Sequence, residues 1–256
     1  MISIVVRTLN EEKHLFKVLK MLYQQTVQDF ELIIVDNCSS DATLSIVAQF
    51  PFSKLVLIPR ELFNHSLSLN LGVFVASYKF VVLLNGHSIP WSKFWLESGL
   101  KNFNDLTVAA IDGNYTANID GSFWEKLFDL KQLHNIYKTR DNLPLTFTNA
   151  IIRKDLWLEY QFDENLPECE DYDWALEMIQ RGYKTIKEPK FNVFHSHHLS
   201  LKEIRERENR WKKVCNLIDS KTRPSYSKSI IFQKGLSEIG VDIYSYKEFK
   251  HKYNKF

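Results

Sequence analysis

The sequence predicts an α/β fold, a mixed and mostly parallel sheet flanked by helices, and residues 1–50 carry this prediction. Ser3–Val6 and Leu32–Val35 are short apolar runs without a helical period, which is typical of buried strands. Between them, apolar residues recur with the spacing of one helix face, at Leu15, Val18, Leu19 and Leu22. Two such strands joined by a helix form a right-handed unit in which the strands are parallel.

Polar loops follow both strands. Asn10 is expected to cap the first helix, with Glu11 and Glu12 in its first turn, where the helix dipole favours acidic side chains. Ser39 or Ser40 is expected to cap the second helix in the same way. Because α/β sheets bind ligands beyond the carboxyl ends of their strands, both loops are predicted to face a ligand.

The rest of the chain continues the alternation of strands and helices. Gly182 is expected to end a helix over 170–181, because glycine is the usual residue after a helix C-terminus. From residue 201 onward the pattern is helical and charged. Strands are expected at 54–58, 80–84, 108–111, 146–152, 184–187 and 192–194, helices at 67–76 and 91–103, and an aromatic-rich helix or loop at 122–138.

The composition is that of an ordinary folded protein, with 45% hydrophobic and 25% charged residues. No apolar run reaches the roughly 18 residues that span a bilayer. The N-terminus is a predicted strand rather than a signal peptide. The three cysteines are odd in number and lack the spacing of a metal site. They indicate a reducing cytoplasm and no disulfide framework.

The charge is unevenly distributed along the chain. Residues 201–256 hold 14 Lys and Arg against 7 Asp and Glu, whereas residues 1–200 hold 19 against 24. A basic C-terminal region can contact an anionic surface such as a membrane leaflet, or it can be a solvated helical extension, and both readings stay open. Nucleic acid is not expected as a partner, because no recognisable binding motif accompanies the charge.

Five short motifs follow one another along the chain. They are Thr8-Leu-Asn-Glu11, Asp36-Asn-Cys-Ser-Ser-Asp41, Asn70-x-Gly72, Glu170-Asp171-x-x-Trp174 and His195-Ser-His197. With these motifs in this order the chain resembles an inverting glycosyltransferase of family 2, which has the GT-A fold, over roughly residues 1–200. The nearest pattern is that of bacterial transferases that build surface polysaccharides such as capsule and the O-antigen of lipopolysaccharide, including rhamnosyltransferases.

The resemblance implies a domain organisation and a reaction. Residues 1–115 would bind a nucleotide-diphosphate-sugar donor and 116–200 would form the acceptor and catalytic half. Residues 201–256 would be a helical basic extension. The sugar would pass with inversion to a glycan or lipid-linked acceptor, in the cytoplasm or at the inner face of the membrane.

The resemblance also implies roles for single residues. Asp171 is the expected base for the acceptor hydroxyl, with the neighbouring Glu170 as the second candidate. Trp174 and Met178 follow on the same helix face, so Asp171 is expected to face inward, where partial burial raises a carboxyl pKa. Acidic capping of the helix is the alternative reading. The expected donor-binding residues are Thr8, Asn10, Glu11, Asp36, Asn70, Asn85, Gly86 and His87.

The chain departs from the family at the fourth strand, where the usual Asp-x-Asp metal motif reads Asn85-Gly86-His87. Imidazole nitrogen suits transition metals, so His87, His195 and His197 are candidate ligands for a divalent cation, Mn²⁺ rather than Mg²⁺. If no metal binds, basic groups such as Arg60 or Arg153 would stabilise the diphosphate.

Two alternatives to a glycosyltransferase stay open. A non-catalytic relative that binds a nucleotide sugar, or a partner subunit, is favoured by the missing carboxylates at residues 85–87 and disfavoured by Glu170 and Asp171. A nucleotidyltransferase would need a glycine-rich, basic loop after the first strand to hold a triphosphate. The chain has Arg7-Thr-Leu-Asn10 there, without glycine, so this class ranks lower.

Overall fold

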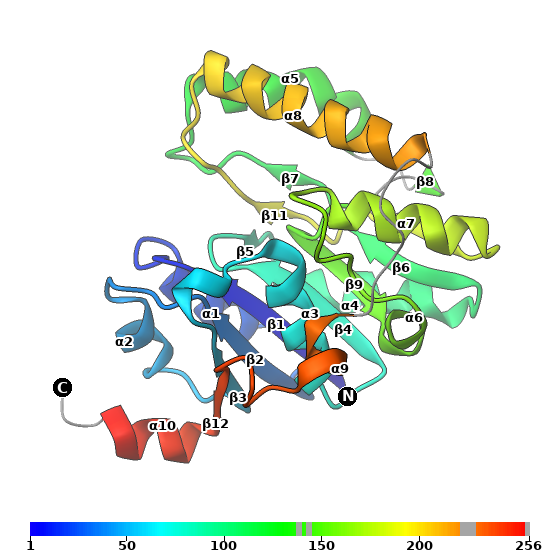
Figure 1. Cartoon of the computed structure of the whole chain (residues 1–256). Coiled ribbons are helices and arrows are strands. Elements are labelled where there is room, and N and C mark those ends of the chain that lie inside the picture. Colours follow the sequence, from blue (N-terminus) through cyan, green and yellow to red (C-terminus); the bar gives the residue numbers. More distant parts are fainter. Residues whose placement is uncertain (137–139, 142–144, 221–228, 254–256) are drawn as a thin grey trace.

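A computed structural model describes the backbone of residues 1–136, 140–141, 145–220 and 229–253 (Figure 1). The strands are β1 (Ile2–Thr8), β2 (Phe30–Asp36), β3 (Lys54–Leu57), β4 (Phe80–Asn85), β5 (Ile89–Pro90), β6 (Val108–Asp112), β7 (Tyr115–Thr116), β8 (Arg140–Asp141), β9 (Asn149–Arg153), β10 (Lys184–Lys187), β11 (Val193–Phe194) and β12 (Asp242–Tyr244). The helices are α1 (Leu15–Leu22), α2 (Thr43–Val47), α3 (His65–Val75), α4 (Trp95–Leu100), α5 (Phe123–Ile136), α6 (Lys154–Glu159), α7 (Glu170–Gln180), α8 (Leu201–Asp219), α9 (Ile230–Lys234) and α10 (Tyr246–Tyr253), with short 3₁₀ turns η1 (Arg60–Leu62) and η2 (Lys101–Asn104).

A nine-stranded sheet in the order β12-β3-β2-β1-β4-β9-β6-β10-β8 forms the centre of the molecule. Strands β3, β2, β1 and β4 are parallel, and β9 runs antiparallel between β4 and β6. This arrangement confirms the predicted parallel unit and the α/β class. The register pairs Thr8 with Asp36 and Arg7 with Asn85, so the polar ends of three strands meet at one edge of the sheet.

Both faces of the sheet are covered, which explains why its inner strands β1, β2 and β4 are apolar on both faces over most of their length. On one face Val5 belongs to a core cluster with Trp157 of α6 and Trp174 of α7, together with α3 and α9. On the other face the alternate residues Ile4 and Val6 pack against α1, α4 and α10. The alternating direction of side chains along β1 therefore holds both helical layers.

The two helix caps predicted in the first loops are wrong. Helix α1 begins at Leu15, and Asn10 lies outside it in a left-handed turn with φ 55°. The Asn10 side chain instead accepts a hydrogen bond from the Ser40 backbone N–H at 2.9 Å. At α2 it is Asp41 that accepts from the Thr43 backbone N–H, at 2.9 Å. Asn10 thus bonds across the two loops, whereas Asp41 bonds both to the start of α2 and, through the Glu12 backbone N–H, across to the first loop.

Other boundaries differ where tertiary pairing decides them. The helix expected from residue 91 begins at Trp95, because the preceding residues form β5 and the Trp91 backbone N–H donates to Asn192. The strand expected from residue 146 begins at Asn149. The segment 122–138 is a helix as far as Ile136, and residues 137–138 lie outside the described residues. Gly182 has φ 87° just after α7, as predicted.

The C-terminal segment contains the expected helices and also a strand that its charged sequence does not predict. Strand β12 pairs antiparallel with β3 and becomes the edge of the central sheet. Phe249 of α10 is 1% exposed and lies in the core. Residues 229–253 are therefore packed against the body of the protein. In the part of the chain that the structure describes, no helix is both long enough and apolar enough to cross a membrane.

Asn70, predicted to bind the donor, has a structural role instead. Its side chain is completely buried in α3. The amide nitrogen donates to the Phe162 carbonyl and to Glu164, at 2.9 and 2.7 Å. The amide oxygen accepts from Trp157 Nε1 and from the Phe162 backbone N–H, at 2.9 and 3.1 Å. All four hydrogen-bonding positions of the amide are used within the protein, which leaves none for a ligand.

We expect Asn70→Ala to lower the free energy of unfolding by about 2–4 kcal/mol, because it leaves Trp157 Nε1 and a backbone N–H buried without partners. Urea denaturation followed by circular dichroism measures this change. Asn104→Ala, at an exposed position in η2, is the matched control and should change stability by less than about 0.5 kcal/mol. Equal unfolding midpoints for the two variants would contradict the structural role of Asn70.

Candidate active site

The loops after β1 and β2 are held together by the carboxylate of Asp36. Thr8 Oγ1 and Ser39 Oγ donate to Asp36 Oδ2 at 2.7 and 2.6 Å, and the Ser39 backbone N–H donates to Oδ1 at 2.9 Å. Asp36 and Thr8 are no more than 1% exposed. Both side chains therefore shape the loops from within, and the direct nucleotide contact predicted for them would require the loops to open.

Asn10 and Glu11 occupy different surroundings in the same loop. Asn10 is exposed, and its backbone N–H donates to Ser39 Oγ. Glu11 turns inward, and its Oε1 lies 2.6 Å from His87 Nδ1. The close approach requires glycine at position 86, where a Cβ atom would lie 2.8 Å from Glu11 Cγ. The structure thus brings Glu11, Gly86 and His87 together through contacts with one another, and their binding of the donor stays a prediction.

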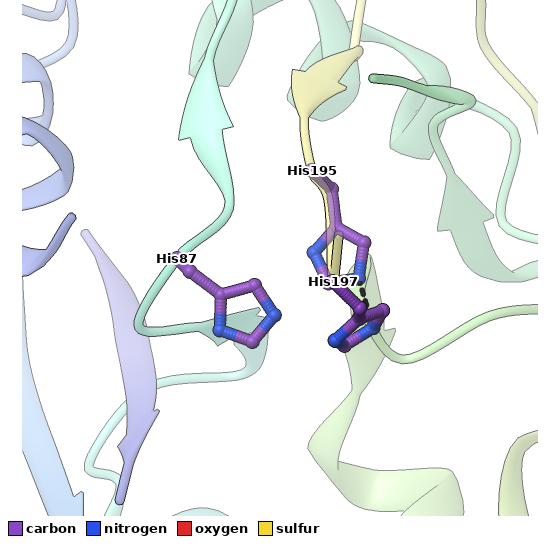
Figure 2. A group of neighbouring side chains, drawn as sticks. All are labelled: His87, His195 and His197. Carbon is purple, nitrogen blue, oxygen red and sulfur yellow. Dashed lines mark hydrogen bonds between the residues drawn. The ribbon is translucent and has the colours of Figure 1, made fainter. Parts of the chain in front are cut away.

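Three imidazoles converge beside this loop, two of them from the segment after β11 (Figure 2). The His87 ring stacks on His195 with centroids 4.5 Å apart, and His197 meets both edge-on. His195 Nε2 and His197 Nε2 are 2.9 Å apart. Each of the three offers a ligand atom within 4.8 Å of the others. The structure therefore brings together the three candidate metal ligands that the sequence predicts.

The protonation of these rings suits metal binding. Burial, aided by the neighbouring imidazoles, holds the pKa of His195 well below its usual value and lowers the pKa of His197 to about 4. Two of the rings use Nδ1 for a contact with the protein. His195 Nδ1 lies 3.0 Å from Ser88 Oγ, and His87 Nδ1 lies 2.6 Å from Glu11 Oε1. Contacts on Nδ1 leave Nε2 to face the centre. His87 Nε2 is buried and has no hydrogen-bond partner among the described residues, so the donor set fits a transition metal.

A second group of potential ligands consists of the buried His14 and the exposed Asp120 and His198. The Lys13 ammonium lies 2.9 Å from Asp120 and 3.1 Å from His198 Nε2, so a protein cation already contacts two of the three members. These contacts place His198 apart from the three converging imidazoles.

The carboxylates of Glu170 and Asp171 begin α7 after a left-handed turn at Cys169, where φ is 70°. Burial raises the pKa of Glu170, while the positive charge of Arg7 acts in the opposite direction. Burial and the charge of Glu170 raise the pKa of Asp171 to about 7. The Phe147 backbone N–H donates to Asp171 at 3.2 Å and orients the carboxylate. A carboxylate that titrates near neutral pH suits a general base.

A cavity of about 320 Å³ opens beside Asp171. Its walls come from the segment after β6, from α5, α7 and the segment after β11, and also from α8. Among the residues that line it are Tyr115, Phe128, His195, His197, Arg207 and Trp211. The sequence predicts an extension from residue 201 onward, and it does not predict that α8 contributes to this cavity.

The sequence contains a signal for this role of α8. Ile204, Arg207, Glu208 and Trp211 line the cavity and recur at i, i+3, i+4 and i+7, which puts them on one helix face. That spacing shows a shared face but not what the face meets. Contact between α8 and α7 fixes the direction of this face. Cys215 Sγ of α8 lies 3.9 Å from Sγ of Cys169, the residue before α7, and both are free thiols.

The basic side chains near the site are not those that the sequence suggests. Arg7 is missed by the prediction, yet it donates to Asn85 Oδ1 at 2.8 Å, and the charges of Glu170 and Asp171 act on it. Arg153 pairs with the first residue of β4 and so lies at the opposite edge of the sheet, bonded to Asp155 at 2.6 Å. Arg153 therefore cannot reach the 85–87 loop, and that prediction is wrong.

Arg60, the other suggested cation, is exposed in η1, shortly after β3. Because β3 is parallel to β2, Arg60 follows the same edge of the sheet as the ligand loops. Its position at this edge does not contradict the predicted role of Arg60 in stabilising the diphosphate, which stays a prediction.

Comparison with known proteins gives the family and the fold of the chain. Residues 3–160, more than half of the chain, match the family described as Glycosyl transferase family 2. The O-antigen chain rhamnosyltransferase WbaN of Salmonella anatum is 29% identical over 201 residues, which cover 73% of this chain and 61% of that protein. The O-antigen chain rhamnosyltransferase RfbN of Salmonella typhimurium is 23% identical, over 79% of this chain and 68% of that protein.

Among solved structures, the chain is similar to the mannosyltransferase PcManGT of Pyrobaculum calidifontis in complex with GDP-Man and Mn²⁺. The TM-score is 0.67 at 16% identity, over 88% of this chain and 65% of that one. This likeness shows that the fold is GT-A. The matched region thus spans less than two thirds of WbaN and of this mannosyltransferase.

Proposed function

The chain belongs to glycosyltransferase family 2, and on this premise we propose that it transfers a sugar, with inversion, from a nucleotide-diphosphate sugar to a hydroxyl of a glycan or lipid-linked acceptor. One observation carries the proposal. Asp171, whose pKa is raised to about 7, opens onto a cavity that His195 and His197 also line. A base and a leaving-group site on one cavity are what a direct displacement at a sugar carbon requires.

Each part of this arrangement has a chemical task. The acceptor hydroxyl enters the cavity and gives its proton to the Asp171 carboxylate while its oxygen attacks the anomeric carbon. The bond from that carbon to the diphosphate oxygen breaks, and the diphosphate leaves with the electron pair. Glu170 stays buried beside Arg7 and raises the pKa of Asp171 by its charge. The fixed contact from the Phe147 backbone N–H keeps the carboxylate oriented for the attack.

We place the donor nucleoside over the loops that Asp36 holds together, and the diphosphate next to residues 85–87. The parallel register of β1, β2 and β4 supports this placement, because it joins these segments at one edge of the sheet. The relatives named as O-antigen rhamnosyltransferases support a deoxyhexose donor and a role in bacterial surface polysaccharide, either O-antigen or capsule.

We further propose that His87, His195 and His197 hold a divalent transition metal, Mn²⁺ in preference to Mg²⁺. Their convergence and the unpartnered His87 Nε2 support this assignment, and imidazole is a poor ligand for Mg²⁺. When bound, the ion would supply positive charge to the donor diphosphate. Glu11 and Ser88 would orient two of the ligand rings through their Nδ1 atoms.

We also propose that the protein works in the cytoplasm, at the inner face of a membrane that carries its acceptor. The excess of Lys and Arg in residues 201–256 supports a contact with anionic lipid. Several of these side chains are exposed on α8, among them Lys212 and Lys213, and they are absent from the cavity wall.

Asp171→Asn should abolish sugar transfer while raising the melting temperature at pH 8. Burial makes ionisation of Asp171 costly in the folded state, so the wild type loses stability as the pH rises through about 7, whereas asparagine does not. A gain on the order of 1 kcal/mol corresponds to about 2–4 °C. Below pH 4 the carboxyl is protonated in both states, and the difference should vanish.

Release of nucleoside diphosphate from UDP-, GDP- and dTDP-sugars measures the transfer, and its kcat/KM should rise with pH and level off above about 7. Glu177→Gln, on the same helix but in an ion pair with Arg181, is the control and should keep full activity. An Asp171→Asn variant that is folded and fully active would sink the assignment of the base.

Mn²⁺ should stabilise the wild type in a thermal-shift assay, and Mg²⁺ at the same concentration should not. At 100 times the dissociation constant, a bound ion adds about 2.7 kcal/mol to the unfolding free energy. His87→Ala and His197→Ala should lose the Mn²⁺ shift. His198→Ala should keep it, because His198 contacts Lys13 instead of the three rings. An equal shift with Mg²⁺, or a Mn²⁺ shift that survives His87→Ala, would rule out the three-imidazole site.

The lipid contact should show itself as sedimentation of the protein with phosphatidylserine-containing vesicles but not with purely phosphatidylcholine vesicles. Reversing Lys212 and Lys213 to Glu should weaken this binding roughly tenfold or more, at about 1 kcal/mol for each basic residue near the surface. Reversal of Lys17 and Lys20, which lie on α1 outside the basic region, is the control. Equal binding by the two double variants would remove the proposed lipid contact.

A further inference from the structure

We propose that Arg207 of α8 binds the diphosphate of the donor as it becomes the leaving group, an assignment that rests on the proposed function. Arg207 lines the same cavity as Asp171, His195 and His197. It lies on a helix beyond residues 3–160, the part of the chain that matches the family. The last helix of the cavity wall would thus complete a site that the N-terminal half begins.

The other basic side chains of this region already have partners. Arg7 donates to Asn85 and has the carboxylates of Glu170 and Asp171 close by. Lys187 lies 2.7 Å from Asp112, and this pair is almost completely buried. Neither cation can turn to a ligand without leaving a carboxylate or an amide unpaired.

Arg207 differs from these two cations. Among the described residues it makes no ion pair, and its Nε is buried without a hydrogen bond. Its guanidinium lies over the Trp211 ring, 4.9 Å from the centroid, which holds the group in place without using its N–H donors. A guanidinium that is positioned but unpaired in a cavity is a binding group for an anion.

Among the described residues, the acidic side chains that line the same cavity form no ion pair with Arg207 either. Glu125 accepts the backbone N–H groups of Ser122 and His197, at 2.9 and 2.8 Å. Asp129 accepts the Ala117 backbone N–H, and Glu208 follows Arg207 directly on α8. An incoming diphosphate would supply the anion that the N–H donors of Arg207 lack.

The position of Arg207 favours the donor diphosphate over other anions. Arg207 shares the wall of one cavity with His195 and His197, the rings proposed to face the donor diphosphate. The diphosphate gains charge as the sugar–oxygen bond breaks, and a guanidinium can bind two of its oxygens at once. A phosphate on the acceptor has the same chemistry, and the experiment separates these two sources.

Isothermal titration of the full chain with UDP, GDP and dTDP first identifies a nucleoside diphosphate that binds the wild type. Arg207→Gln should weaken its binding roughly 10- to 100-fold, the range for lost hydrogen bonds to a charged group. Arg207→Lys should restore part of the affinity, since a point charge replaces the planar fork. The nucleoside itself, without phosphates, should bind wild type and variant alike. Arg205→Gln, exposed on the same helix, is the control and should bind like the wild type.

The outcomes separate the two proposals. If the wild type binds a nucleoside diphosphate and both Arg207 variants, with unchanged melting temperatures, bind it equally well, the role of Arg207 is overturned and the proposed function stands. If diphosphate binding is unchanged but the KM for a phosphate-bearing acceptor rises, Arg207 serves the acceptor and the donor assignment is wrong. If the wild type binds no nucleoside diphosphate, the proposed function fails and this role falls with it.

Discussion

The parallel pairing of β1 with both β2 and β4 is the constraint on which the rest of the structure depends. It sets Thr8 beside Asp36 and Arg7 beside Asn85, so the polar segments from three strands begin at one edge of the sheet. The loops then hold one another through Asp36, and the Glu11 side chain reaches His87. Without that register neither the cross-bonded loops nor the imidazole cluster could form.

Local patterns in the sequence predict a large part of this arrangement. The buried strands, the start of α7 at Glu170 and the convergence of His87 with His195 and His197 follow from periodicity and from the order of the motifs. Such patterns say which residues share a face or follow a strand. They do not say which partner a polar side chain meets. Asn70 was therefore assigned to a ligand, although Trp157 and Phe162, some 90 residues away, use its amide completely.

The same limit applies to α8. Its sequence is mostly charged, and only Ile204 and Ile218 are buried. From sequence alone it resembles a solvated helix, because three of the four residues that line the cavity, Arg207, Glu208 and Trp211, are charged or aromatic. The packing of Cys215 on Cys169 and the direction of one helix face decide its role, and both are properties of tertiary structure. The division between a catalytic body and an extension at residue 200 remains a prediction, but the cavity extends across it.

Strand β12 has a consequence for how the chain behaves in a crowded solution. It occupies the outer edge of β3, which would otherwise present unpaired backbone groups to strands of other chains. The new edge is only Asp242–Tyr244, and Asp242 is exposed on it. Short length and a charged side chain both discourage further strand addition. Strand β12 thus protects this edge of the central sheet against edge-to-edge aggregation.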